Sequence, residues 1–158
     1  MSATRIAEQS NTFSTGGGGV HFENQVQAVF AISLFLDGFA PVVSLPNREL
    51  HFQAKRMGYD TDDLVVESWM YPSQKAKLLC QMKHDIVVSD AKSNTVFQEV
   101  INAAWSDYTK SIFNKDIDKI ALLYVLHSLL HLISNNSSFI KFSHLYYNVY
   151  SVRFIVHI

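Results

Sequence analysis

Apolar and polar positions along the chain follow two periods, and each period predicts a different kind of element. In residues 21–37, apolar side chains recur every three to four positions, which is typical of a helix with one buried face. Gly38 follows this stretch as an expected stop. Residues 95–110 show the same helical period, and Thr95 with Gln98 has the spacing of a capping box. The apolar stripe of this second helix consists of Val96, Phe97, Val100, Ile101, Ala104, Trp105 and Tyr108.

Between and after these two helices, short apolar runs bounded by turn residues predict β-strands. The expected strands are residues 48–56, 64–71, 78–88 and 119–126. Residues 57–63, with glycine and clustered aspartates, form the expected turn before the second strand. The polar connection 72–77 is short, so the second and third strands should pair as an antiparallel hairpin. The order helix, strand, strand, strand, helix, strand predicts an α/β domain with a mixed central sheet flanked by helices.

The third expected strand carries polar side chains where a buried strand should be apolar. Side chains two positions apart on a strand share a face. One face carries Leu79, Gln81, Lys83 and Asp85, and the other carries Leu78, Cys80 and Met82. Two interpretations are open at this point: the polar face lies in water, or it lines an active site.

Composition limits the class of protein. A chain of 158 residues with 48% apolar and 17% charged residues is about one globular domain. The net charge of -1 gives no global sign of nucleic-acid binding, so any DNA contact would need a local basic patch or bound metal cations. A single cysteine excludes an internal disulfide framework and a cysteine-rich zinc site. The first residues lack the charged-then-apolar pattern of a signal sequence, so we expect a cytoplasmic protein with no membrane partner.

Three parts of the chain differ in composition. Residues 1–19 are polar and end in a run of glycines, which predicts a flexible lead-in before an α/β domain over residues 20–126. Residues 127–158 contain no acidic residue, and this atypical composition raises the hypothesis that they are a truncated or non-native continuation. His127 and His131 have the spacing of a helical metal site but lack a third ligand, so we expect ordinary core or surface histidines.

Polar residues in three of the expected elements have the types and the order of a metal-dependent hydrolytic site. Asp63 opens the second strand, and the hairpin places it beside the face that bears Gln81 and Lys83. Asp63 and the Gln81 carbonyl are hard oxygen ligands for Mg²⁺, and Glu23 on the first helix is a further candidate ligand. Lys83 could orient a water molecule or stabilise a charged transition state. Asp62 remains an alternative to Asp63 as the metal ligand.

These residues resemble the active-site core of a known superfamily. The stretches "TDDLVVES" and "LLCQMKHD" are similar to the D…(D/E/Q)xK motif of PD-(D/E)XK nucleases, with glutamine in place of the second acid. The glutamate in "GGGGVHFENQVQAVF" resembles the first-helix glutamate of that superfamily. The likeness covers roughly residues 16–123 and is closest to the N-terminal nuclease effector domains of bacterial anti-phage defence proteins.

The resemblance carries expectations about fold, chemistry and partners. It implies a restriction-endonuclease-like mixed sheet flanked by helices. It implies an active site of Glu23, Asp63, Gln81 and Lys83, with Glu23, Asp63 and Gln81 as ligands of Mg²⁺ or Mn²⁺. It also implies cleavage of double-stranded DNA, and either self-association or a sensor or ATPase partner that controls this activity.

Other features of the sequence limit this interpretation. Gln53 and Lys55 repeat the Q-x-K spacing, but no acidic residue opens a strand at the right distance before them. His84 adjoins Lys83 but should point to the opposite face of the strand, which makes it a structural or surface residue. The rival function is a catalytically inactive interaction module that packs the sheet and the Trp105 helix against a partner.

Overall fold

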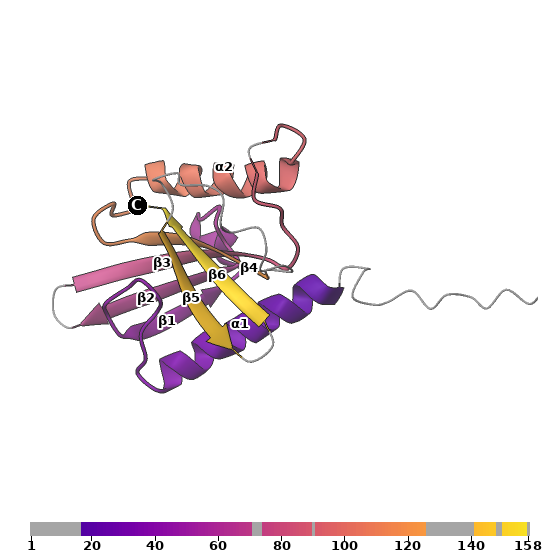
Figure 1. Ribbon diagram of the computed structural model, residues 1–158. Coiled ribbons are helices and arrows are strands. Elements are labelled where there is room, and N and C mark those ends of the chain that lie inside the picture. The colour runs from indigo at the N-terminus through magenta and orange to yellow at the C-terminus, as the bar shows by residue number, and fades with distance from the viewer. Residues whose placement is uncertain (1–16, 71–73, 90, 126–140, 148–149, 158) are drawn as a thin grey trace, which may run out of the picture.

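The helices and strands follow the predicted order. The computed structural model describes residues 17–70, 74–89, 91–125, 141–147 and 150–157, the last two segments as backbone only. The elements are α1 (Gly18–Phe35), β1 (Asn47–Phe52), the 3-10 helix η2 (Ala54–Met57), β2 (Leu64–Met70), β3 (Gln74–Lys83), α2 (Thr95–Thr109), β4 (Lys119–Val125), β5 (Lys141–Tyr147) and β6 (Tyr150–His157). Up to β4, this is the order expected from the sequence, with the short η2 added before β2 (Figure 1).

One mixed sheet forms the centre of the domain, and this coarse fold class is confirmed. Its strand order is β1-β2-β3-β4-β6-β5. β2 pairs antiparallel with both β1 and β3, whereas β3 and β4 run parallel because α2 returns the chain to the same end of the sheet. The predicted hairpin is also confirmed, with Leu64 opposite Cys80 at one end and Met70 opposite Gln74 at the other.

The third strand is shifted relative to its prediction. β3 begins at Gln74, so most of the expected loop 72–77 is strand that pairs with the end of β2. Gln74 and Lys75 are exposed strand residues, and their polarity made this part of the sequence resemble a loop. β3 ends at Lys83. The prediction that Asp85 shares the face of Gln81 and Lys83 is therefore wrong, because Asp85 lies outside the strand.

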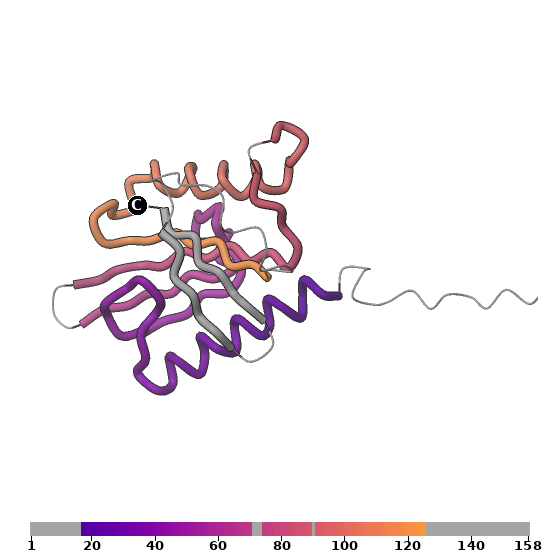
Figure 2. The backbone as a smooth tube through the Cα atoms, in the orientation of Figure 1, coloured from indigo at the N-terminus to yellow at the C-terminus, as the bar shows by residue number. Residues whose placement is uncertain are grey.

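Helices cover both faces of the sheet, as α1 and α2 lie on opposite sides of the strands in Figure 2. The α1 side buries Phe22, Val26 and Phe30 together with Leu78, Cys80 and Met82 of β3. The α2 side buries Val65, Leu79 and Ile120, with Ala104 and Tyr108 of α2 packed against them. Leu79 and its two sequence neighbours therefore face different layers, and the predicted division of this strand into two faces is confirmed.

α1 begins earlier than predicted and is followed by a turn that needs glycine. The helix starts at Gly18 rather than His21, so the last glycines of the expected lead-in are helical. After the helix, the Gly38 amide donates to the Ser33 carbonyl at 2.7 Å. A Cβ at Gly38 would lie 2.5 Å from Ser33 Oγ, so a larger residue would push this turn apart. The helix ends at Phe35, and Gly38 lies in the tight turn that follows it.

α2 is capped one residue before the predicted cap. The side chain of Asn94, rather than that of Thr95, accepts the Phe97 amide at 3.3 Å. Asn94 also donates to the Val87 carbonyl at 2.6 Å, which ties the helix start to the segment after β3. The predicted capping box is wrong, because Asn94 is the cap, and the Gln98 side chain donates to the Ala91 carbonyl instead of accepting the Thr95 amide.

The apolar stripe predicted for α2 is only partly buried. Val100 is buried, and Phe97, Ala104 and Tyr108 pack against the sheet with part of their surface exposed. The exposed members of the stripe are Val96, Ile101 and Trp105. The helical period could not separate these groups, because residues on the flank of a helix recur with the same spacing as those that face the sheet.

Replacing the cap tests its assignment. Asn94→Ala should lower the free energy of unfolding by about 1–2 kcal/mol, because the Phe97 amide and the Val87 carbonyl lose their partner. Thr95→Ala, the matched control at the residue that the sequence favoured, should change it by less than about 0.5 kcal/mol. Urea unfolding followed by circular dichroism measures both, and equal losses would show that Asn94 is not the cap.

Candidate functional site

The start of β2 and the end of β3 meet at a buried contact between Asp63 and Gln81. Because Leu64 lies opposite Cys80, the residues just outside this pair are neighbours. Gln81 Nε2 donates to Asp63 Oδ2 at 2.5 Å, and the Met82 amide donates to the same oxygen at 2.6 Å. Asp63 and Gln81 are each 8% exposed. The interpretation of this strand face as solvated is therefore wrong for Gln81.

The contact fixes the orientation of the Gln81 amide. An ionised carboxylate only accepts hydrogen bonds, so the amide turns its nitrogen toward Asp63 and leaves its oxygen, Oε1, for another partner. Asp63 likewise has Oδ1 besides the oxygen that accepts both bonds. Neighbouring strands thus offer one anionic and one neutral oxygen, and such hard oxygens suit Mg²⁺ or Mn²⁺.

The acidic groups at this end of the sheet are incompletely neutralised. Burial raises the pKa of Asp63, and the Asp62 charge adds to this effect, while hydrogen bonds and Lys83 oppose it. Burial also raises the pKa of Glu23, followed by the charge of Asp63, and Lys83 again opposes the shift. Lys83 is half-buried and is the cation that acts on both acids. A bound cation would relieve the remaining excess of negative charge.

Glu23 reaches the site from α1. Its neighbour Phe22 packs edge-on against His84, with ring centroids 6.1 Å apart, and this contact holds the start of α1 next to the end of β3. Within the described residues, no hydrogen bond or ion pair joins Glu23 to Asp63 or Gln81; the link is electrostatic. The structure therefore brings Asp63 and Gln81 into contact, whereas Glu23 acts on them through its charge.

Of the two neighbouring aspartates, Asp63 is the one in the contact. Asp62 is half-buried, and its backbone carbonyl accepts the Ala54 amide at 2.6 Å. This bond fixes the Asp62 peptide, but its carboxylate contributes to the Asp63–Gln81 contact only through charge. The geometry thus favours Asp63 over Asp62 as a ligand.

The remaining sequence candidates lie elsewhere. Gln53 has a positive φ of 52° and Lys55 belongs to η2, so this second Q-x-K motif does not share a strand face. His84 contacts Phe22 on the α1 side, away from the face of Gln81, as the sequence predicted. His127 and His131 lie outside the described residues.

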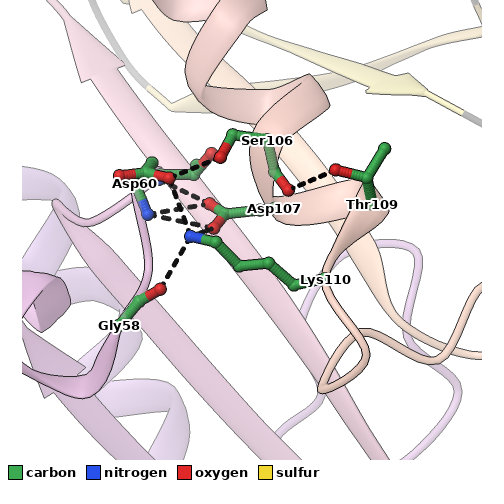
Figure 3. A network of polar contacts seen from close by, with 7 residues as sticks. Gly58, Asp60, Ser106, Asp107, Thr109 and Lys110 are labelled. Carbon is green, nitrogen blue, oxygen red and sulfur yellow. Dashed lines mark hydrogen bonds and ion pairs between the residues drawn. The ribbon is translucent and has the colours of Figure 1, made fainter.

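A polar network holds the turn that precedes Asp63. Asp107, near the end of α2 and 1% exposed, accepts the Asp60 amide at 3.0 Å (Figure 3). It also accepts the Thr61 amide at 2.6 Å. Lys110 donates to the carboxylates of Asp60 and Asp107 at 2.7 Å each (Figure 3). Asp107 was not predicted as a functional residue, although an acid within the apolar pattern of a helix was a signal for it.

A separate group of potential metal ligands lies on β1 and β2. Glu49 and His51 of β1 and Glu67 of β2 each place a ligand atom within 4.8 Å of the other two. In the part of the chain that the structure describes, no other trio of acidic, histidine or cysteine side chains comes this close, including those around Asp63. These three residues could hold a metal ion. The E-x-H spacing in β1 was a signal for them, but Glu67 could be found only from the strand register.

Comparisons with known proteins give no class for this chain. No protein family, curated protein or solved structure matches it. The likeness to PD-(D/E)XK nucleases therefore rests on the quoted motifs alone. None of the described helices is both long and apolar enough to cross a membrane.

Asp63→Asn tests the effect of burying this carboxylate. Because burial raises the pKa of Asp63, the folded chain binds the proton more tightly than the unfolded chain does. The ionised group therefore opposes folding above its raised pKa, and this effect is absent below the ordinary value of 3.8. Asp63→Asn should unfold at a higher temperature than the unchanged chain at neutral pH in EDTA, and the difference should vanish in acid.

Thermal unfolding followed by circular dichroism across this pH range measures the effect. Asp116→Asn, which neutralises an exposed carboxylate, is the matched control and should leave the unfolding temperature nearly unchanged. If Asp63→Asn were less stable than the unchanged chain at neutral pH, the charge argument would be wrong.

Asp107→Ala tests the network before β2. The substitution leaves the amides of Asp60 and Thr61 without their acceptor and removes one anion from Lys110. We expect the free energy of unfolding to fall by about 2–4 kcal/mol, measured by urea denaturation. Glu99→Ala, an exposed position on the same helix, should change it by less than about 0.5 kcal/mol. Similar values for the two variants would show that the network does not stabilise the turn.

Proposed function

We propose that this chain is a metal-dependent endonuclease domain that hydrolyses phosphodiester bonds of double-stranded DNA. The observation that carries the proposal is the buried contact of Asp63 with Gln81, two positions before Lys83 on β3. Two oxygen ligands and an ammonium group are thus offered at one end of the sheet. The resemblance of the surrounding motifs to PD-(D/E)XK nucleases supports the same interpretation.

The donor set fits Mg²⁺ or Mn²⁺. Asp63 Oδ1 and Gln81 Oε1 would bind the ion, and Glu23 would add a carboxylate directly or through water. The raised pKa values of Asp63 and Glu23, caused first by burial, are those of acids that gain from a nearby cation. When bound, the ion would offset charge on a phosphate and make a water molecule more acidic.

The side chains around the ion have distinct tasks in this proposal. The ammonium of Lys83, a half-buried residue, would donate to a phosphate oxygen and stabilise the charge that develops there in the transition state. Glu23 orients the attacking water from the α1 side. Asp63 holds the Gln81 amide so that its oxygen faces away from the carboxylate.

Binding of DNA would depend on these local charges, because a net charge of -1 provides no general attraction to a polyanion. Unregulated cleavage would damage the host's own DNA. We therefore propose that its activity depends on self-association or on a sensor or ATPase partner, as the resemblance to cytoplasmic anti-phage effectors implies.

Cleavage of a supercoiled plasmid with Mg²⁺ or Mn²⁺ tests the proposal. Lys83→Ala and Asp63→Ala should each reduce nicking by about 100-fold or more, because each removes a group that stabilises charge. Lys55→Ala removes the lysine of the second Q-x-K motif from η2 and should cleave like the unchanged chain. Cleavage that survives in both Lys83→Ala and Asp63→Ala would refute the assignment.

A binding measurement complements this assay, because the isolated chain would be inactive if it needs a partner. In a His51→Gln background, which removes a ligand of the second group, Mn²⁺ should raise the unfolding temperature. This rise should persist with Lys55→Ala and disappear with Asp63→Ala.

A second candidate function is an interaction module without catalytic activity. The observation that favours it is the exposure of Trp105, which is 59% exposed on α2 and stacks on Tyr108 with ring centroids 5.6 Å apart. Large exposed aromatic side chains are common anchors of protein interfaces. This function requires no metal ion at Asp63. If Asp63→Ala changes neither DNA cleavage nor Mn²⁺ binding, the interaction module is favoured over the nuclease.

A further inference from the structure

The pairing of β1 with β2 assembles Glu49, His51 and Glu67 on one face of the sheet. Glu49 lies directly opposite Glu67, and His51 follows Glu49 by two positions, which directs both side chains to the same face. A β-bulge between Asn47 and Glu49 shifts the register just before this pairing. The three side chains are therefore held by paired strands rather than by a loop.

A ring nitrogen of His51 faces both carboxylates but makes no hydrogen bond. Nε2 lies 3.4 Å from Glu49 Oε2 and 3.9 Å from Glu67 Oε1. Among the described residues, this nitrogen has no hydrogen-bond partner, and it is shielded from solvent. If Nε2 carries no hydrogen, its lone pair is repelled by the two carboxylate oxygens. If Nε2 carries a hydrogen, the N–H bond does not point well enough at either oxygen to form a hydrogen bond. A cation between the three atoms removes this conflict.

Charge at this place is only partly balanced. Glu49 and Glu67 lie directly opposite each other on paired strands, so their negative charges repel. The Glu67 side chain is only 10% exposed, and an unpaired charge costs free energy when it is buried to this extent. Lys75 forms an ion pair with Glu67 Oε2, and its ammonium lies 5.1 Å from the centroid of the Trp69 ring. The other oxygen, Glu67 Oε1, faces His51. One oxygen of Glu67 thus remains for a metal ion even while Lys75 stays in place.

We propose that Glu49, His51 and Glu67 bind a divalent transition-metal ion of the Zn²⁺ class. Zn²⁺ takes both imidazole nitrogen and carboxylate oxygen ligands, and three protein ligands leave a fourth position for water, whereas Mg²⁺ takes oxygen ligands. Ligand atoms about 2 Å from a tetrahedral Zn²⁺ lie about 3.3 Å from one another. The two separations from His51 Nε2, 3.4 and 3.9 Å, are close to this value, and the carboxylate oxygens of Glu49 and Glu67 lie within 4.8 Å of each other.

This site is distinct from the one at Asp63. Asp63 accepts hydrogen bonds from Gln81 and Met82 of β3, whereas Glu67 Oε1 faces His51 of β1. The two sites therefore draw their ligands from different neighbours of β2. The proposal therefore does not depend on the nuclease function, and either can fail without the other.

Calorimetric titration of the metal-free full chain with Zn²⁺ tests the site. His51→Gln and Glu49→Gln should each weaken Zn²⁺ binding by at least about 10-fold, since loss of a supporting group near a metal already has this effect. Glu49 has a half-exposed side chain, so its substitution leaves the core intact, and circular dichroism of both variants should match the unchanged chain. The same substitutions should remove the rise in unfolding temperature that Zn²⁺ produces in the unchanged chain.

Two matched variants separate this site from other binding. The chain has seven histidines, so the difference between variants, rather than binding as such, is diagnostic. Glu99→Gln, on the surface of α2, and Asp116→Asn, at another exposed carboxylate, should both keep the affinity of the unchanged chain. The proposal is overturned if Zn²⁺ does not bind the unchanged chain, if His51→Gln and Glu49→Gln keep its affinity, or if Glu99→Gln and Asp116→Asn lose it.

Lys75 gives a test of opposite sign. Its ammonium neutralises Glu67 and would repel a metal ion nearby, and its side chain is 58% exposed, so it can leave without disturbing the core. Lys75→Gln should therefore bind Zn²⁺ more tightly than the unchanged chain. Weaker binding by Lys75→Gln would contradict the placement of the metal at Glu67.

Discussion

The antiparallel pairing of β2 with both of its neighbours is the constraint on which the rest of the structure depends. Toward β3, the register brings Asp63 beside Gln81, and toward β1 it brings Glu67 opposite Glu49. Apolar side chains of β2 fill the layers on both faces, and a slip of one residue would exchange the layers and separate each polar pair. The hydrophobic core thus determines where the polar groups meet, although it contributes no polar interaction of its own.

β2 and the turn before it also concentrate negative charge that the fold neutralises unevenly. The Asp107 carboxylate is well neutralised, because it accepts hydrogen bonds from two backbone amides and from the Lys110 ammonium. At Asp63, burial leaves the pKa raised despite nearby hydrogen bonds, and at Glu67 a single lysine supplies the balancing charge. Native folds keep such imperfectly balanced groups mainly where function requires them. The contrast separates an acid whose charge is neutralised within the fold from acids whose charge is only partly neutralised.

The sequence predicted what depends on local periodicity and missed what depends on exact pairing. The two-residue alternation of β3 and the hairpin order were sufficient to bring Gln81 near Asp63. They could not locate Asp107, because its partners lie far away in the sequence and helical period does not report on tertiary hydrogen bonds. Glu67 was hidden in an apolar run, and its meeting with His51 follows from a register that contains a bulge. The cap of α2 was wrong by one residue, since Asn94 and Thr95 are both good capping types.

The position of the only cysteine has a consequence for how opening of the core under α1 can be observed. Cys80 is fully buried, and burial, together with the Asp63 charge, raises the pKa of its thiol. An alkylating reagent attacks the thiolate, so it can react only after the layer between α1 and the sheet has opened and water has entered. The rate of alkylation therefore counts openings of this layer. A cation held by Asp63 and Gln81 and by Glu23 of α1 would tie the helix to the sheet, and its presence would be recorded as protection of a sulfur atom that it never touches.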